Sequence, residues 1–237
     1  MFGYYYGFDL SYLVLVVPAI LLGLWAQARV QSTYARYSQV RAVRGITADQ
    51  VARRILDANG LRDVSIQRIA GSLTDHYDPR ERVVRLSETV YGSPSIAAIG
   101  VAAHEVGHAV QHATGYAPLK LRTAIVSVTN IGSTLSMPLI LIGILLNSSR
   151  LALVGVALFG LVAVFQLVTL PVEFNASSRA LATLDGMDIL GREELGGARQ
   201  VLTAAALTYV AALIQSLAQL LRLPPTNSSN RSSWARD

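Results

Sequence analysis

The sequence predicts a mainly α-helical protein that crosses a membrane about four times and carries a small β-hairpin or sheet outside the membrane. Two observations lead to this fold class. Of the 237 residues, 52% are hydrophobic and only 15% are charged, which is unusual for a soluble protein. The hydrophobic residues also gather in long runs, each near the ~20 residues that a helix needs to cross a ~30 Å hydrocarbon layer.

Four apolar runs mark the predicted spans. They are Leu10–Ala28, Ala124–Leu146, Leu151–Leu170 and Val201–Leu221, the last of which contains two glutamines. The first run could also be a signal peptide, because Ala26-Gln27-Ala28 resembles a cleavage site. A retained anchor is favoured, because residues 1–9 contain one acid and no basic residue, the opposite of a secretory signal.

Basic residues flank the first two spans and predict the orientation of the chain. Those after the first span are Arg29, Arg36, Arg41 and Arg44, and those before the second are Lys120 and Arg122. By the positive-inside rule, residues 29–122 face the cytoplasm of a multi-pass protein in the cell membrane. The net charge of +5 is explained by basic residues that lie beside the spans, at the surface of the lipid bilayer. No nucleic-acid partner is therefore expected.

The spans divide the chain into six segments. They are an anchor at 1–28, a cytoplasmic domain at 29–122, a helical hairpin in the membrane at 123–170, a cytoplasmic segment at 171–200, a fourth span at 201–222 and a disordered tail at 223–237. The tail is assigned by its Ser, Asn and Arg content. The chain has no cysteine, so it has no disulfides and no thiolate ligands.

Within the cytoplasmic domain, local signals predict one helix and three strands. The capping-box pattern Thr47–Gln50 opens a helix that stops at Gly60. Val64–Ile69 alternates as a strand does. Two further strands, Leu73–Tyr77 and Arg82–Leu86, flank a turn-forming Asp-Pro-Arg-Glu tetrad, which predicts a β-hairpin.

The stretch from Ser95 to Thr114 is predicted to be a buried helix, capped by Ser93 with Pro94 at its first position. It contains His104-Glu105-Val106-Gly107-His108. Two histidines four residues apart share one helical face, so both imidazoles can reach one metal ion. A carboxylate beside the first histidine can take a proton from metal-bound water. The alternative is a pair of hydrogen-bonded core histidines.

His112 repeats the spacing but is not expected to bind the same ion. It lies eight residues after His104, or ~12 Å along the axis, whereas zinc–nitrogen bonds are only ~2 Å long. We expect His112 to be a helix-end residue or a hydrogen-bond partner near the site.

A third ligand must come from elsewhere, and two acidic residues are candidates. Glu173 directly follows the third apolar run, where a carboxylate needs a partner that a metal could supply. It could also be an ordinary helix N-terminal glutamate. Asp185, in Leu-Asp-Gly, is the alternative, and with the histidine motif it resembles the pairing in site-2-type intramembrane proteases.

Four stretches, read in order, resemble the YugP-type membrane zinc metallopeptidases. They are Leu73–Pro79, Val84–Ser87, Ala102–Ala109 and Leu170–Ser177. The resemblance implies a zincin-like motif helix and one zinc ion per chain, held by His104, His108 and Glu173 with Glu105 as the catalytic base. In zincins an edge strand above the metal helix pairs with the substrate, a role that we assign to one strand of the predicted hairpin.

Several side chains around the ligands are candidates for supporting roles. Many zincins of this type carry an aspartate four residues after the ligand glutamate, where this chain has Ser177. Candidates for the missing hydrogen-bond partner are Asn175, Asp185 and Asp188, and Arg179 is a candidate for stabilising the oxyanion. Asp75 and His76 are read as solvated hairpin residues in preference to metal-associated ones.

The expected function is that of a zinc-dependent metalloendopeptidase acting on peptide or protein substrates, membrane proteins among them. One alternative is a site-2-like intramembrane protease that uses Asp185. It would require the motif helix inside the bilayer, yet only nine residues, 95–103, form an apolar stretch before the motif. The other alternative is a non-catalytic zinc-binding membrane scaffold, which would not need Glu105. The sequence carries no signal for an oligomeric state.

Overall fold

The computed structural model describes residue 10 and residues 12–222. The start of the expected anchor and the whole expected tail, residues 223–237, lie outside the described residues. The chain forms two compact units. The site unit consists of Leu24–Leu121 and Val168–Val210, and the helical unit consists of the described parts of Met1–Gly23, Arg122–Leu167 and Ala211–Asp237.

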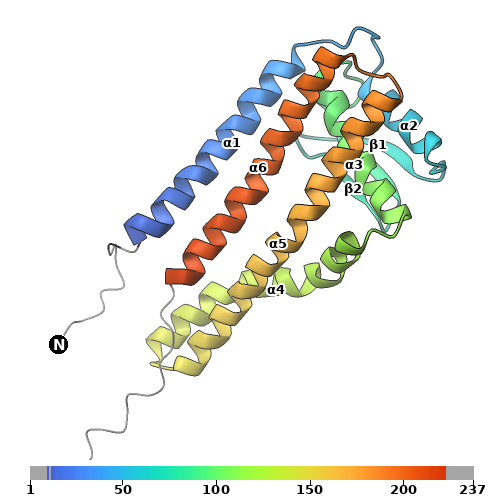
Figure 1. Cartoon of the computed structure of the whole chain (residues 1–237). Helices are drawn as coiled ribbons and strands as arrows, with labels where there is room; N and C mark the ends of the chain where they lie inside the picture. The colour runs from blue at the N-terminus through green and yellow to red at the C-terminus, as the bar shows by residue number, and fades with distance from the viewer. Residues whose placement is uncertain (1–9, 11, 223–237) are drawn as a thin grey trace, which may run out of the picture. The chain divides into compact units, whose positions relative to one another are not determined.

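Four long helices correspond to the four apolar runs (Figure 1). They are α1 (Val17–Ser38), which follows a π-helical turn η1 (Tyr12–Val16), α4 (Ala117–Leu145), α5 (Ser149–Gly186) and α6 (Arg192–Arg222). With η1 counted as part of the first, each is long and apolar enough to cross a membrane. The prediction of a mainly helical, multi-pass fold is confirmed.

Helix α5 continues where the sequence suggested a boundary. The third apolar run ends at Leu170, and Pro171 removes one backbone N–H donor. The helix nevertheless passes through Pro171 and ends at Gly186. The residues beyond the proline bury one face of this part of the helix, including Val172, Ala176 and Ala180. This burial offsets the lost hydrogen bond and keeps Glu173 on the same helix as the span.

In the helical unit, α4 and α5 pack closely through small residues. A Cβ atom built on Gly155 of α5 would lie 2.7 Å from the carbonyl oxygen of Ser136 and 2.8 Å from the backbone nitrogen of Ile140, both on α4. Close backbone approach of this kind is the usual basis of helix association in lipid, where apolar burial gives no driving force.

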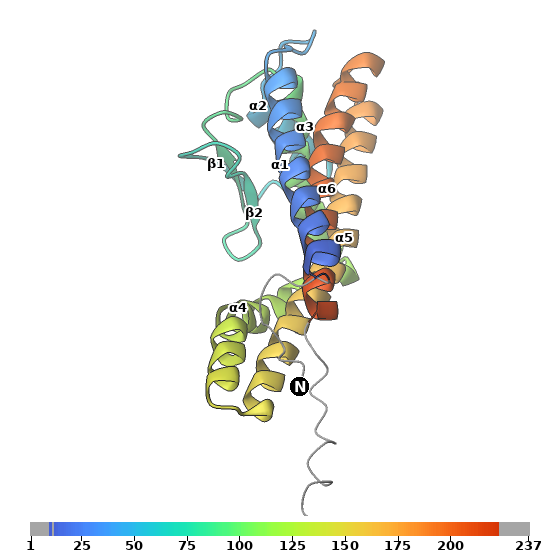
Figure 2. The same ribbon diagram turned by 90° about the vertical axis from the view of Figure 1, so that its left-hand side faces the viewer.

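The site unit contains the remaining elements, with a three-stranded sheet beside α3 (Figure 2). They are α2 (Ala48–Ala58), β1 (Ser65–Ile69), β2 (His76–Asp78), β3 (Val83–Ser87) and α3 (Ile96–Ala113). The strand order is β1-β3-β2, with β1 parallel and β2 antiparallel to β3. The predicted hairpin is confirmed, although its first strand is His76–Asp78 and not Leu73–Tyr77. The side chain of Gln50 accepts a hydrogen bond from the N–H of Thr47, as the capping pattern predicted.

Helix α3 forms the core of the site unit. It contacts α2, β2 and β3, and most of its residues are buried. Its cap is Ser95, whose hydroxyl accepts from the N–H of Ala98 at 3.2 Å. The prediction of a cap at Ser93 with Pro94 in the first turn was wrong by two residues, because the Ser95 hydroxyl is the one that reaches a free helical N–H.

Candidate metal centre

His104 and His108 lie one turn apart on the same face of α3. Their ring centroids are 4.8 Å apart, and the rings are nearly perpendicular. Four-residue spacing on a helix produces this proximity directly. His108 is buried and His104 is partly buried. The expected sharing of one face by the two imidazoles is therefore seen in the structure.

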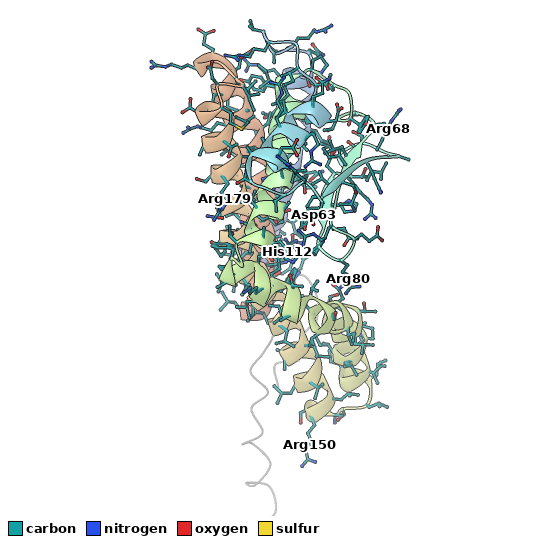
Figure 3. All side chains as sticks on the ribbon, turned by 90° about the vertical axis from the view of Figure 1, so that its right-hand side faces the viewer. Asp63, Arg68, Arg80, His112, Arg150 and Arg179 are labelled. Carbon is teal, nitrogen blue, oxygen red and sulfur yellow. The ribbon has the colours of Figure 1, made fainter. Side chains whose placement is uncertain are left out.

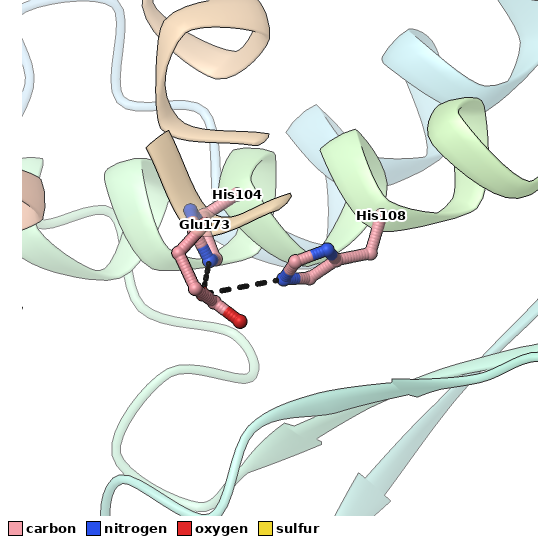
Figure 4. A group of neighbouring side chains, drawn as sticks. All are labelled: His104, His108 and Glu173. Carbon is pink, nitrogen blue, oxygen red and sulfur yellow. Dashed lines mark hydrogen bonds and ion pairs between the residues drawn. The ribbon is translucent and has the colours of Figure 1, made fainter. Parts of the chain in front are cut away.

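Glu173 of α5 completes a three-residue cluster with these histidines (Figure 4). Its Oε2 atom lies 3.2 Å from Nε2 of His104 and 3.6 Å from Nε2 of His108. The ligand atoms of the three side chains all lie within 4.8 Å of one another. Only 4% of the Glu173 side chain is exposed, so its charge depends on these partners and not on water.

Gly107 allows α5 to approach α3 closely enough to form this cluster. A Cβ atom on Gly107 would lie 2.8 Å from the carbonyl oxygen of Ala176 and 3.2 Å from its Cα. Any side chain at this position would push the two backbones apart. Because Gly107 precedes His108 directly and Ala176 lies about one turn after Glu173, the contact sets the distance between Glu173 and the two histidines.

Each histidine uses its second ring nitrogen to contact a neutral side chain. Nδ1 of His104 lies 3.0 Å from the hydroxyl of Ser177, and Nδ1 of His108 lies 3.0 Å from the side-chain oxygen of Gln111. When Nδ1–H donates to these oxygens, the lone pair on Nε2 faces Glu173. Burial lowers the pKa of His108, but Glu173 and Glu105 raise it more, so that its pKa lies above the ordinary histidine value.

Gln111 also ties α3 to α5. It is fully buried, and its amide nitrogen donates to the carbonyl oxygen of Val172 at 2.8 Å and to the side-chain oxygen of Asn175 at 3.0 Å. The sequence reasoning did not single out Gln111. The available signal was its position three residues after His108, which puts both side chains on one helical face.

The three clustered side chains fit a zinc ion. Two imidazole nitrogens and one carboxylate oxygen are a donor set of catalytic zinc sites, which keep a fourth position open. In a tetrahedron with bonds of ~2.0–2.1 Å, neighbouring ligand atoms lie about 3.3 Å apart. The distances of 3.2 and 3.6 Å from Glu173 to the two histidines are close to this value.

A cavity of about 270 Å³ adjoins the cluster. Glu105 lines it together with His104 and Glu173, so the glutamate of the motif borders the same space as two members of the cluster. The cavity also borders Val30 of α1 and Ala205 of α6. A substrate bond in this cavity would therefore lie beside both the cluster and Glu105.

Asp75 lines the same cavity and is not a solvated hairpin residue. Its carboxylate accepts hydrogen bonds from the backbone N–H and the hydroxyl of Ser87, at 2.7 and 2.9 Å. Burial raises the pKa of Asp75 above its usual range, although the bonds from Ser87 act in the opposite direction. His76, by contrast, is exposed as expected.

The structure places the other candidate residues away from the cavity. The side-chain oxygen of Asn175 accepts hydrogen bonds from Arg179, at 2.8 Å, and from Gln111. Asn175 and Arg179 therefore belong to the hydrogen-bond network behind His108. Nδ1 of His112 lies 2.9 Å from the hydroxyl of Tyr77 and joins α3 to β2. Figure 3 marks Arg179 on α5 and His112 towards the end of α3. Neither residue lines the cavity beside Glu105.

Asp185 and Asp188 do not join the cluster. Asp185 is exposed near the end of α5, 12 residues after Glu173. At 1.5 Å per residue this separation corresponds to about 18 Å along the helix. Asp188 forms an exposed ion pair with Arg44. Of the two candidate third ligands, the structure therefore brings Glu173 to the histidines.

Residues 12–225 match the family model described as "Putative neutral zinc metallopeptidase". The chain belongs to this metallopeptidase family. It is 51% identical over 211 residues to the protein named "Putative membrane protease YugP" of Bacillus subtilis (strain 168), a match covering 89% of this chain and 94% of that protein. No solved structure matches the chain.

Membership confirms the resemblance to YugP-type membrane metallopeptidases that the motifs predicted. Zinc is the metal of this metallopeptidase family, and His104, His108 and Glu173 form a group suited to hold it. The four apolar helices agree with a membrane location.

Proposed function

We propose that this membrane metallopeptidase is an endopeptidase that holds zinc with His104, His108 and Glu173 and uses Glu105 as its general base. The observation that carries the proposal is the position of Glu105. It is buried, it lies beside the three-residue cluster without belonging to it, and it faces the cavity. A carboxylate that is free of the metal and next to the substrate space is available for proton transfer.

When bound, zinc supplies a Lewis acid that lowers the pKa of a coordinated water to ~7 and polarises the scissile carbonyl. Glu105 takes the proton that the attacking water loses. It then returns this proton to the leaving amine when the carbon–nitrogen bond breaks. Ser177 and Gln111 keep the two imidazoles oriented during these steps, because each contacts an Nδ1 atom.

The sheet offers one free edge for an extended substrate next to α3. In the described sheet β3 is paired on both sides, so β2 is the hairpin strand whose outer edge is open. Because β2 contacts α3 and follows Asp75, which lines the cavity, this edge leads to the site. We assign substrate-backbone binding to β2, in the manner of strand addition to a sheet.

Two alternatives have less support. A site-2-like enzyme would need Asp185 as a ligand, yet this residue is exposed and far along α5 from the histidines. A zinc-binding scaffold would not need a buried glutamate beside a cavity. Burying an ionisable group lowers stability, and in a scaffold no catalytic role would offset that cost.

The proposed substrates are peptides or proteins, cleaved on the cytoplasmic side of the membrane. The arginines after the first span and the basic pair before the second support this orientation. Glu173 follows the third span, so the parity of the spans puts it on the same side as the two histidines. The cluster of all three in the site unit is consistent with that parity.

The test is zinc content together with casein cleavage by the full-length protein. Glu105→Gln should retain about one zinc per chain and lose at least ~10²-fold in cleavage rate, because it removes only the base. Glu193→Gln, an exposed glutamate at the start of α6, is the matched control and should behave like the wild type. Loss of zinc in Glu105→Gln would contradict the assigned role, and failure of the zinc-loaded wild type to cleave either casein or a membrane-anchored polypeptide would contradict peptidase activity.

A further inference from the structure

The cavity beside Glu105 has two chemically different walls. One wall carries the polar groups of the site, including His104, Glu105 and Asp75. The other comes from α1 and α6, two helices with the composition of membrane spans. Most residues of this wall are apolar, namely Val30, Val201, Leu202, Ala205 and Ala206, and Gln27, Thr208 and Tyr209 add three polar groups. A soluble peptidase would have no reason to build half of its substrate cavity from membrane helices.

Three helices change from apolar to charged residues at the level of this cavity. On α1 the apolar run is followed by Arg29, on α5 it is followed by Glu173, and on α6 it begins just after Arg199. On each helix a residue at this position or within two residues of it lines the cavity, namely Val30 on α1, Glu173 on α5 and Val201 on α6. A change of this kind marks the membrane surface in a spanning helix.

Exposed aromatic residues also place the membrane surface at the height of the cavity. Trp25 of α1 is 53% exposed and Phe174 of α5 is 50% exposed. Trp25 lies one turn before Arg29, and Phe174 is next to Glu173. Aromatic side chains, tryptophan above all, favour the boundary between lipid and water. The metal centre therefore has the surroundings of a site at the membrane surface.

The space between α1 and α6 leads from the polar end of these helices towards their apolar runs. At the polar end the helices touch, because a Cβ atom on Gly197 of α6 would lie 2.7 Å from Cε1 of Tyr37 on α1. Val30 and Ala205 lie seven and eight residues further along, about 10–12 Å towards the apolar runs. There the side chains are small and the cavity opens. This part can accept an apolar substrate side chain.

We propose that the substrate is the membrane-proximal segment of a polypeptide anchored in the same bilayer. Its scissile bond lies at the membrane surface beside Glu105, and an apolar side chain next to this bond enters between α1 and α6. The inference rests on the proposed peptidase function and names its substrate class. Anchoring in the same membrane also raises the local concentration of such a segment over that of a soluble peptide.

A pair of matched reporters in proteoliposomes tests this substrate class. One reporter has a single membrane-spanning helix followed by a flexible linker of mixed composition and a soluble domain. The other has the same linker and domain without the helix. The wild type should cleave the anchored linker at least ~10-fold faster, because anchoring raises its local concentration. The cuts should fall close to the membrane, next to apolar residues.

The outcomes separate this inference from the proposed function. Equal cleavage of the two reporters, or cleavage of casein alone, would overturn the anchored substrate and leave the peptidase function intact. Cleavage of neither reporter nor casein by zinc-loaded protein would overturn both. Glu105→Gln should abolish every cleavage that the wild type shows.

A substitution in the apolar wall tests the pocket itself. Ala205→Phe adds a ring to the cavity, so it should shift the cleavage sites in the anchored linker from bulky apolar residues to small ones, with zinc content unchanged. Thr203→Phe adds the same ring two residues earlier, at an exposed position outside the cavity lining, and should leave the cleavage sites unchanged. The same cleavage pattern in both variants would overturn the pocket.

The membrane level can be measured without any activity. The chain has two tryptophans, so Trp234→Phe leaves Trp25 as the sole reporter. In bilayers of brominated lipids, Trp25 fluorescence should be quenched most by bromines near the headgroup end of the acyl chains. Strongest quenching by bromines near the chain ends, or no quenching at all, would remove the site from the membrane surface and overturn the inference.

Discussion

The hydroxyl of Ser177 lies 3.0 Å from Nδ1 of His104, one helical turn after Glu173. The YugP-type resemblance left this position unexplained, because many related zincins carry an aspartate there. A hydroxyl can orient the imidazole as an aspartate does, without a second negative charge beside buried Glu173. The partner of His104 is thus the residue that occupies the expected position, although it is of a different chemical type.

Removing this hydroxyl should weaken zinc binding without unfolding the protein. We expect Ser177→Ala to lower zinc affinity by ~10-fold, the lower end of the effect of losing a hydrogen bond to a ligand histidine. The affinity is measured by competition with a chelator of known affinity. Ser178→Ala, at the exposed neighbouring position, is the control. Equal affinities in the two variants would mean that Ser177 does not orient His104.

Gln111 should matter for both stability and metal binding. Gln111→Leu leaves the carbonyl oxygen of Val172 without its hydrogen-bond donor, which should cost ~1–3 kcal/mol of unfolding free energy. Loss of the partner of His108 should also weaken zinc binding ~10–100-fold. Chelator competition and thermal unfolding measure the two effects. His112→Gln, whose partner is Tyr77, should keep wild-type zinc affinity; a matching loss there would point to a general effect of altering α3.

Two glycines of α3 provide a matched test of helix contact. A Cβ atom on Gly107 would lie 2.8 Å from the backbone of Ala176, whereas one on Gly100 would lie 3.4 Å from the Cβ of Ala198. Gly107→Ala should therefore separate α3 from α5, lower stability by ~1–3 kcal/mol and reduce zinc content. Gly100→Ala should be neutral or stabilising by up to ~1 kcal/mol, because alanine favours a helix. Normal zinc content in Gly107→Ala would show that the contact does not set the ligand distances.

The third ligand can be tested by metal analysis of two purified variants. Glu173→Ala should lose both zinc and activity, because it removes one of the three proposed protein ligands. Asp185→Ala should keep full zinc content, because Asp185 is exposed and about 18 Å along α5 from Glu173. Zinc retained without Glu173 but lost without Asp185 would restore the site-2-like alternative.

The orientation in the membrane can be tested with single cysteines, since the chain has none of its own. Arg80 lies in the turn between β2 and β3, and Ser148 lies just before α5 (Figure 3 marks Arg80 and, two residues after Ser148, Arg150). In intact cells, a membrane-impermeant thiol reagent should label Ser148→Cys and not Arg80→Cys. The reverse pattern would place the metal centre outside the cell.

The sequence by itself determined the features that depend on local pattern. Apolar runs of sufficient length predicted the four spans, and four-residue spacing put His104 and His108 on one helical face. Turn residues between two short strands predicted the hairpin of β2 and β3. These properties need only neighbouring residues, so they can be read without knowing how the helices pack.

Only the tertiary structure decided which distant residues complete the site. Glu173 and Asp185 were both open as ligands, and the Gly107–Ala176 contact brings the first of them to the histidines. The same packing pairs Ser177 with His104 and Gln111 with α5, while the hairpin brings Asp75 to the cavity. Such contacts join residues tens of positions apart. They depend on how closely two backbones can approach, which no local pattern in the chain specifies.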